Sequence, residues 1–350
     1  MKAIAYDRYG PPEVLHVADM PRPTPDDDEV LIRVHATEVT KADCELRSFQ
    51  FAVKWFWLPL RLAFGAFKPR RQILGLYFAG VVAETGAAAS GFAVGEEVFG
   101  SAGLKMGAYG EYLAVPATAT VVAKPKSLSF AEAAAVPLGG LNAFHFLRLA
   151  AIEPGESVLV NGAGGSIGLH AVQIAKAMGA EVTAVDKSLK ETLVRRMGAD
   201  HFIDYTARSF ADTDSRYDVI FDMVPTSAYE DCMKVLKDNG RYLNGNPKLS
   251  TMLRCWWTTR FSDRTASCAF ARETREELLE LKAMIERGEL RSIVDEVLPM
   301  EQIAEAHHKV EQETRLGAIV VSIADQVGFS RLNVRSMQAS PSLRASPPDP

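Results

Sequence analysis

The sequence predicts an α/β protein with two domains, one rich in β-strands and one built on a doubly wound parallel sheet. Its 350 residues exceed what a single ordinary domain needs. Residues 1–125 read as short strands separated by turns, whereas strands alternate with helices from about residue 157 onward. In the stretch 157–168 an apolar strand runs into a cluster of small residues and then into a helix. This order of elements is typical of a nucleotide-binding sheet joined to a β-rich domain.

Composition narrows the class of protein. Hydrophobic residues make up 47% of the chain and charged residues 24%, as is usual for a globular protein in water. The formal net charge of −5 gives no electrostatic reason to expect nucleic acid as a main partner. The four cysteines form no C-x-x-C pair, which suits a reducing cytosol and argues against a disulfide framework or a Cys-rich structural zinc site. The N-terminal Met1–Tyr6 lacks the apolar core of a signal peptide, so we expect a cytoplasmic protein.

The β-rich part begins with a strand at Met1–Tyr6 and continues with short strands divided by turns. Val30–Ala36 alternates after a turn rich in Pro and Asp, and glycines punctuate the strands predicted around 80–84 and 97–100. The pattern changes near residue 127. Helices are predicted over Ser129–Ala135 and Leu141–Ala151.

The alternating part predicts a parallel sheet. Apolar residues recur at helical spacing over Ser166–Met178, and Gly179 follows where a C-cap glycine belongs. A charged helix is predicted over 272–287 and a closing strand over 317–323. From 325 to 350 the chain is rich in Ser, Pro, Arg and Gln without periodicity, so we predict a disordered tail. The predicted strands are Val158–Asn161, Glu181–Asp186, His201–Asp204, Tyr217–Asp222 and Arg241–Leu243.

The segment 49–67 is unusually rich in aromatic residues and leucine, including Trp55 and Trp57. Lys54, Pro59 and Arg61 interrupt it, which makes it too short and too charged for a membrane span. We expect a loop or short helix packed over a core. An apolar lid over a hydrophobic substrate site is the alternative, and peripheral contact with a membrane is the least favoured reading.

The small residues of the strand-to-helix turn predict a dinucleotide site. Backbone N–H groups can approach a pyrophosphate there, with the positive end of the helix dipole behind them. The Rossmann fingerprint begins here with alanine in place of its first glycine, and the small neighbouring residues keep the turn tight. A merely structural tight turn is the competing reading. The residues predicted to hold the cofactor at this turn are Ala163, Gly164, Gly165, Ser166, Ile167 and Gly168.

The residues after the second strand give conflicting signals about the cofactor. Asp186 lies 18 residues after Gly168, where a carboxylate can accept hydrogen bonds from the adenosine ribose, which favours NAD(H). Lys187 and Lys190 follow at once, and cations here stabilise the 2′-phosphate of NADP(H). A solvated helix start is an equally good explanation of the two lysines.

With the glycine cluster placed after a β-rich domain, the chain resembles the medium-chain dehydrogenase/reductase superfamily. The resemblance is strongest to its zeta-crystallin-like branch of zinc-free quinone oxidoreductases, and it covers roughly residues 1–323. It implies a GroES-like catalytic domain over 1–125 and 272–324, a Rossmann domain over 126–271, a cofactor cleft between them and usually a homodimer. The matching segments are Met1–Ile4, Tyr9–Leu15, Glu29–Ala36, Val94–Gly100, Ala134–Pro137, Ala171–Lys176, Gly198–Asp200 and Ile203–Tyr205.

The same resemblance bears on the cofactor and on zinc. In NADPH-using relatives a lysine and a tyrosine clasp the 2′-phosphate, and Lys190 and Tyr205 fall on those positions, which gives a slight lean to NADPH over NADH. Zinc-containing relatives use a cysteine where this chain has Thr40, and a Gly-His-Glu motif where it reads Gly-Leu-Tyr at 75–77. These side chains do not replace zinc ligands, so we expect no zinc. The adjacent His307 and His308 are expected to be solvated.

Without a metal, the chemistry expected is hydride transfer from nicotinamide to a quinone or an α,β-unsaturated carbonyl or enoyl acceptor. Such an acceptor moves the incoming charge onto oxygen, where hydrogen-bond donors stabilise it. By family position the candidate catalytic residues are Thr40, Asp43 and Tyr77. Thr40 stands where zinc-free relatives have an asparagine, and the alternatives are a turn-bracing hydrogen bond for Asp43 and packing for Tyr77. Two other functions stay open. One is a metal-free NAD(P)-dependent alcohol dehydrogenase, and the other is a dinucleotide-binding redox sensor with little turnover.

Overall fold

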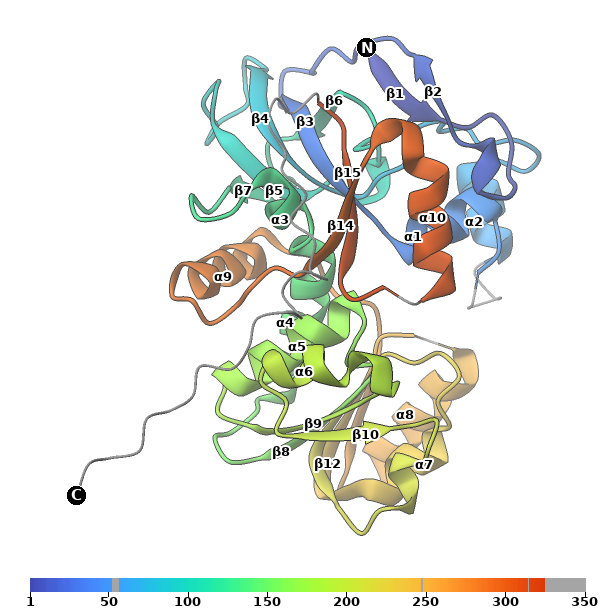
Figure 1. The fold of residues 1–350 in the computed structure, drawn as a ribbon, viewed down its shortest axis with the longest axis vertical. Helices are drawn as coiled ribbons and strands as arrows, with labels where there is room; N and C mark the ends of the chain where they lie inside the picture. Colours follow the sequence, from blue (N-terminus) through green and yellow to red (C-terminus); the bar gives the residue numbers. More distant parts are fainter. Residues whose placement is uncertain (52–56, 247, 314, 325–350) are drawn as a thin grey trace.

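The computed structural model describes residues 1–51, 57–246, 248–313 and 315–324. Two large sheets dominate it, one in the upper half of Figure 1 and one in the lower half. The upper sheet is built from both ends of the chain, and the middle of the chain forms the lower sheet. The strands are β1 (Lys2–Ala5), β2 (His16–Asp19), β3 (Glu29–Val39), β4 (Tyr77–Thr85), β5 (Glu97–Ser101), β6 (Tyr112–Pro116), β7 (Val121–Ala123), β8 (Ser157–Asn161), β9 (Glu181–Asp186), β10 (His201–Asp204), β11 (Tyr217–Asp222), β12 (Leu236–Asn244), β13 (Thr265–Cys268), β14 (Val294–Pro299) and β15 (Ala318–Ser322).

The upper sheet has seven strands. Six follow the order β14-β15-β3-β4-β5-β7, and the seventh, β6, pairs with the first half of β3. The long strand β3 lies at its centre, because it pairs antiparallel with β15, β4 and β6. Most residues of β3 are buried on both faces. Any polar side chain in the second half of this strand is therefore placed inside the protein.

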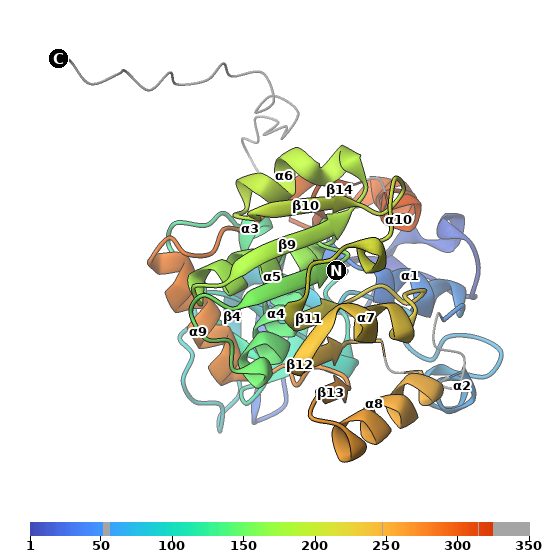
Figure 2. The ribbon, with the colours of Figure 1, turned by 90° about the horizontal axis from the view of Figure 1, so that it is seen from below.

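The lower sheet is parallel throughout, in the order β10-β9-β8-β11-β12-β13. From β8 the chain adds β9 and β10 on one side, and then β11, β12 and β13 on the other. The position between β8 and β11 is therefore a topological switch point, and ligands bind outside the carboxyl ends of the strands at such a point. Figure 2 shows the strands of this sheet laid out side by side among their helices, from β10 at the top to β13 at the bottom. The predicted alternation of strands and helices is confirmed. The helices of the chain are α1 (Lys41–Ser48), α2 (Trp57–Phe64), α3 (Phe130–Ala134), α4 (Pro137–Ala150), α5 (Ser166–Ala177), α6 (Glu191–Arg196), α7 (Tyr229–Val235), α8 (Leu249–Phe261), α9 (Arg275–Glu286) and α10 (Ile303–Gln312).

One apolar core connects the two sheets. Val158 and Val182 of the parallel sheet belong to it, together with Phe146 of α4 and with Ala79 and Phe99 of the upper sheet. The opposite face of the parallel sheet packs on α7 and α8 in a separate cluster. Because α3 and α4 are buried between the sheets, the two halves are held together by the hydrophobic effect rather than by a linker alone.

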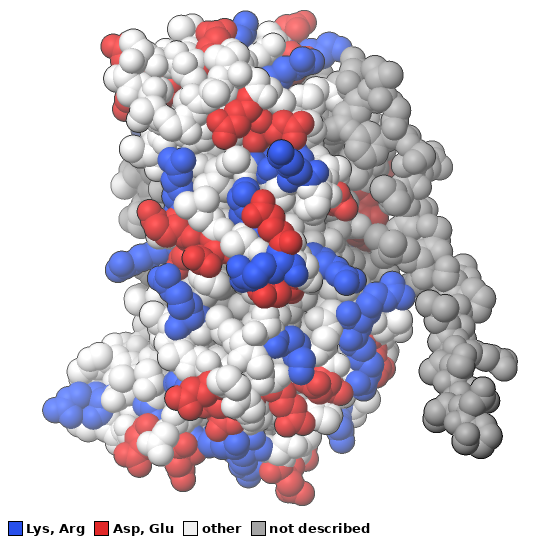
Figure 3. Space-filling model, turned by 90° about the vertical axis from the view of Figure 1, so that its left-hand side faces the viewer, with Lys and Arg blue, Asp and Glu red and all other residues white. Residues whose placement is uncertain are grey.

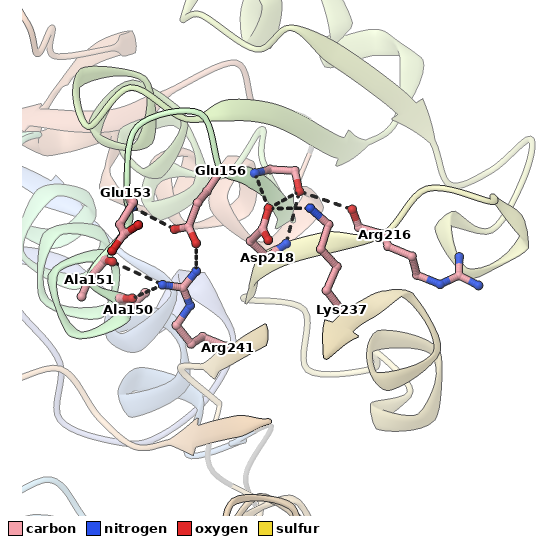
Figure 4. A network of polar contacts seen from close by, with 9 residues as sticks. Ala150, Ala151, Glu153, Glu156, Arg216, Asp218, Lys237 and Arg241 are labelled. Carbon is pink, nitrogen blue, oxygen red and sulfur yellow. Dashed lines mark hydrogen bonds and ion pairs between the residues drawn. The ribbon is translucent and has the colours of Figure 1, made fainter. Parts of the chain in front are cut away.

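A polar network fixes the amino ends of the parallel strands. Arg241 donates to the carbonyl oxygen of Ala150 over 3.0 Å and pairs with Glu156 (Figure 4). Asp218 accepts from Ser157 Oγ over 2.7 Å and from Lys237 Nζ over 2.8 Å. Burial raises the pKa of Asp218, but the hydrogen bonds from Lys237 and Ser157 outweigh it and lower the pKa to about 2. The opposite, carboxyl edge of the sheet is left for a ligand.

The described part of the aromatic segment forms a short helix that is largely exposed. Residues 52–56, including Trp55, lie outside the described residues. In the described part, no residue of α2 is buried, and Leu58 and Leu62 are 61% and 65% exposed. The helix is held at the surface by Tyr9, whose hydroxyl donates to the Phe64 carbonyl, and by Arg61, which stacks on the ring of Phe49. Phe64 at the C-terminal end of α2 packs against the core of the upper sheet, so α2 is the expected short helix over a core, although most of its apolar residues face outward.

Charges of both signs are interspersed on the face seen in Figure 3, so that face offers no single-sign patch for a polyanion. Within the described ranges, none of the helices combines the length and the apolar character that a membrane crossing requires.

Candidate functional site

The glycine-rich loop joins β8 to α5 in a backbone conformation that its small residues make possible. Gly162 has a φ of +85°, a value that residues with a Cβ rarely adopt. A Cβ on Gly168 would lie 2.2 Å from the Gly162 carbonyl oxygen, so only glycine lets the helix approach the loop this closely. By contrast, a Cβ on Gly165 would meet nothing nearer than 3.5 Å. Gly165 thus leaves open space on the ligand side of the loop.

The start of α5 is an uncapped helix N-terminus. Gly165 occupies the N-cap position and has no side chain to accept from the first amides, which lack intrahelical acceptors. Ser166 and Ile167 begin the helix behind it. Uncapped amides and the positive end of the helix dipole together suit the phosphates of a dinucleotide. The loop therefore fits the cofactor that its sequence predicts.

In the structure, Asp186 hydrogen-bonds to the glycine-rich loop. Its Oδ2 accepts from the backbone N–H of Gly164 over 2.7 Å, and its Oδ1 accepts from the N–H of Lys187 over 2.8 Å. The side chain of Lys190 is buried and donates from Nζ to the carbonyl oxygen of Gly164 over 3.1 Å. The side chains of Asp186 and Lys190 thus both hydrogen-bond to the backbone of Gly164 in the loop. Tyr205 is 50% exposed nearby, and its N–H donates to the Asp186 carbonyl oxygen.

Thr40 and Asp43 meet at the start of α1. Thr40 is the N-cap residue, and its hydroxyl both donates to Asp43 Oδ2 over 2.6 Å and accepts from the Asp43 N–H over 3.1 Å. Asp43 Oδ1 accepts from the N–H of Gly75, which ties the helix to the loop before β4. Burial raises the pKa of Asp43 to about 6, against the hydrogen bonds from Thr40 and Gly75. This pair forms a capping box that fixes the end of β3.

Tyr77 begins β4, whose start pairs with the end of β3 next to Thr40. Its hydroxyl donates to Glu273, which also accepts from Ser101 Oγ over 2.7 Å. Burial, together with the charge of Glu273, raises the pKa of Tyr77 well above its usual value, so the hydroxyl keeps its proton. Asp43 accepts from the N–H of Gly75, two residues before Tyr77, so the three predicted catalytic residues lie in one region.

Sequence reasoning missed two buried acids near these groups. Glu38 in β3 has no exposed surface, and its Oε1 accepts from the Ser166 hydroxyl over 3.2 Å. Asp222 ends β11 at the switch point, where Asn161 of β8 donates to it over 2.9 Å and Tyr242 donates over 2.9 Å. Burial raises the pKa of Asp222. The signal that could have found Asp222 is an acid at a strand end, whereas Glu38 lies among other polar residues along β3 and gave no clear signal.

His307 is not solvated as expected. It has no exposed surface, and its ring nitrogens contact Cys44 Sγ at 3.2 Å and the Tyr109 hydroxyl at 3.1 Å. Burial lowers the pKa of His307 to about 3, so the ring is neutral at physiological pH. His308 does face solvent, where it contacts Glu13. In the part of the chain that the structure describes, no group of three or more His, Cys, Asp or Glu side chains is arranged to hold a metal ion.

Comparison with known proteins agrees with this architecture. Residues 26–126 match the alcohol dehydrogenase GroES-like domain, and residues 197–321 match the zinc-binding dehydrogenase family. A 2-methylene-furan-3-one reductase of Solanum lycopersicum is 34% identical over 69% of this chain and 61% of its own length. A chloroplastic NADPH-dependent alkenal/one oxidoreductase of Arabidopsis thaliana is 30% identical over 92% of this chain and 79% of its own.

A solved structure extends the likeness to the whole fold. The quinone oxidoreductase of Coxiella burnetii superposes with a TM-score of 0.80 at 26% identity, covering 93% of this chain and 99% of its own. The arrangement of the two large sheets is therefore shared with that structure. The chain belongs to the medium-chain dehydrogenase/reductase superfamily, in its zinc-free quinone oxidoreductase-like branch.

Proposed function

We propose that this protein is a zinc-independent, NAD(P)H-dependent oxidoreductase that transfers hydride to a quinone or to an α,β-unsaturated carbonyl or enoyl acceptor. The observation that carries the proposal is the uncapped start of α5 behind a glycine loop, in a chain whose relatives are named as quinone, enone and alkenal reductases. When bound, the nicotinamide supplies the hydride. The protein supplies binding, orientation and the charge pattern around the acceptor.

The loop residues are assigned to the cofactor. Gly165 gives the pyrophosphate close access to the backbone, and the first amides of α5, from Ser166 to Gly168, donate to its oxygens. Ala163 and Gly164 shape the turn on the strand side. Ala163 does so through its N–H, which donates to the Val185 carbonyl oxygen over 3.1 Å.

NADPH is the cofactor that we propose, in preference to NADH. The Asp186 carboxylate already accepts from two backbone amides, which leaves it less free to receive ribose hydroxyls. Lys187, Lys190 and Tyr205 gather at the same end of β9, where a 2′-phosphate would lie. Lys190 would have to turn from the Gly164 carbonyl oxygen to reach that phosphate.

On the acceptor side, Tyr77 is the proposed hydrogen-bond donor to the oxygen that gains charge. Its raised pKa keeps the proton on the hydroxyl, and Glu273 holds that hydroxyl until an acceptor replaces it. Thr40 and Asp43 position the end of β3 through the capping box. The Tyr77 hydroxyl is thus the hydrogen-bond donor, and conjugation in the acceptor delivers the negative charge to the oxygen that it binds.

The partner proposed for the protein is a second copy of itself, in the cytoplasm. Leu253, Trp256, Trp257 and Phe261 are more than half exposed on α8, beside β13 at the end of the parallel sheet. Exposed apolar surface next to an outer strand is commonly covered by self-association. The two-domain division, 1–125 with 272–324 and 126–271, is proposed from the family resemblance, and the predicted tail, 325–350, lies outside the described residues.

The proposal is tested by following the absorbance of reduced nicotinamide with purified protein, a chelator, and a panel of quinones, 2-alkenals and enones. We expect acceptor-dependent oxidation, faster with NADPH than with NADH. Oxidation of alcohols by NAD(P)⁺ without turnover of any conjugated acceptor would contradict it. Tight nucleotide binding with no turnover of either kind would favour a redox sensor instead.

A further inference from the structure

Glu38 is a buried acid that the proposed mechanism does not use. It is 0% exposed in the second half of β3, where its neighbours along the strand are packed into the upper sheet. One carboxyl oxygen accepts from the Ser166 hydroxyl, and the other, Oε2, is buried without a hydrogen-bond partner among the described residues. Burying a carboxyl group with an unpaired oxygen costs free energy.

The position of Glu38 relates it to the cofactor loop. Ser166 is the first residue of α5, whose uncapped amides face the place where a phosphate would bind. Glu38 reaches this point from β3 of the other sheet. Its carboxyl group therefore contacts the first residue of a helix start that attracts anions.

The charges around Glu38 come from three directions. The guanidinium of Arg315, which precedes β15, favours the ionised acid, and the carboxyl group of Asp43 in α1 disfavours it. Burial outweighs both and raises the pKa of Glu38 to about 8, although the Ser166 hydroxyl favours the charged form. Tyr77 of β4 and Tyr109 also sense the charge of Glu38, which raises the pKa of each. At neutral pH the carboxyl group is therefore largely protonated.

We propose that Glu38 makes dinucleotide binding dependent on pH, by donating a hydrogen bond to the cofactor's phosphate when neutral and repelling it when ionised. The inference rests on the proposed dinucleotide site. A neutral acid beside a phosphate is a donor, whereas two anions at a water-poor junction repel each other. Arg315, whose Nη1 is buried without a partner among the described residues, faces the same acid and tempers the repulsion.

The test is the dissociation constant of NADPH, followed by nucleotide fluorescence between pH 7 and pH 9.5. The neutral fraction of Glu38 falls from about nine tenths at pH 7 to about one tenth at pH 9, so the constant of the wild type should rise up to about tenfold. The cofactor's own phosphates are already ionised in this range. Glu38→Gln is neutral at every pH and keeps N–H donors, so it should retain the pH 7 affinity throughout. Glu277→Gln, at another buried carboxyl with one unpaired oxygen, is the matched control and should follow the wild type.

The outcomes separate the two proposals. An equal rise in Glu38→Gln, or a flat profile in the wild type, would overturn the role of Glu38 while leaving the cofactor site in place. Failure of folded wild type to bind either NADPH or NADH at any pH would overturn the proposed function and this inference with it. If Glu38→Gln does not fold, Ser166→Ala decides instead. That variant removes the donor to the ionised acid and should move the midpoint of the pH profile upward, and an unmoved midpoint would contradict the proposal.

Discussion

Asp186 accepts a hydrogen bond from the backbone N–H of Gly164 over 2.7 Å, so the acid at the end of β9 braces the loop that should bind the cofactor. If bracing is its role, Asp186→Ala should weaken the binding of NADPH and NADH by a similar factor, about tenfold, because the loop loses a charge-assisted hydrogen bond. The measurement is the dissociation constant of each nucleotide. Weaker NADH binding combined with tighter NADPH binding would instead show that Asp186 contacts the ribose.

Two glycines of the loop should behave differently when changed to alanine. In Gly168→Ala the new methyl group meets the Gly162 carbonyl oxygen at 2.2 Å, so we expect a loss of about 1–3 kcal/mol in the free energy of unfolding. Gly165→Ala has room for its methyl group and should fold with nearly wild-type stability, yet bind nucleotide at least tenfold more weakly, about 1.4 kcal/mol. Urea unfolding and nucleotide titration check both. Normal nucleotide binding by Gly165→Ala would argue against a phosphate at this loop.

The pair formed by Tyr77 and Glu273 predicts a kinetic result. Tyr77→Phe removes the proposed donor, and kcat should fall about a hundredfold with little change in the KM for NADPH. Ser101→Ala is the control, because it removes the other hydroxyl bound to Glu273 and leaves Tyr77 in place. Unchanged kcat in Tyr77→Phe would assign the side chain a packing role.

The buried Glu38 also predicts how stability depends on pH. Its folded pKa of about 8 lies above the ordinary value of 4.5, so the folded state binds the proton more tightly than the unfolded state. The stabilisation is fully present below the ordinary pKa and is lost as pH rises through about 8. Relative to Glu38→Gln, the wild type should lose up to about 1.4 kcal/mol per pH unit between these values. Urea unfolding at pH 5, 7 and 9 measures this, and parallel profiles for the two proteins would contradict it.

Much of the fold could be predicted because its signals are local. The strand, turn and helix from Ser157 to Ala177 show an apolar run, small residues and a helical period in immediate succession. The helix N-cap formed by Ser129 and Glu132 is likewise a local signal, because it spans only four residues. By contrast, β14 has a weaker local pattern and owes its place to pairing with β15, so it was not predicted.

The site was harder to predict because its contacts join distant parts of the chain. The sequence places Asp186 at the expected distance after Gly168, but it does not show that the side chain turns back to the Gly164 amide. Glu273 meets Tyr77 across 196 positions, and Ser166 meets Glu38 across 128. Spacing rules describe one element at a time, whereas these pairs depend on how two sheets pack.

The most direct test of the central claim follows the hydride itself. NADPH carrying deuterium at C4 of the nicotinamide, in separate preparations for each face of the ring, is mixed with an enone in the presence of chelator, and the product is examined by NMR. We predict that the product is a saturated ketone that carries deuterium at the β-carbon. Deuterium at the carbonyl carbon of an allylic alcohol would contradict it, and would assign the protein to carbonyl reduction instead.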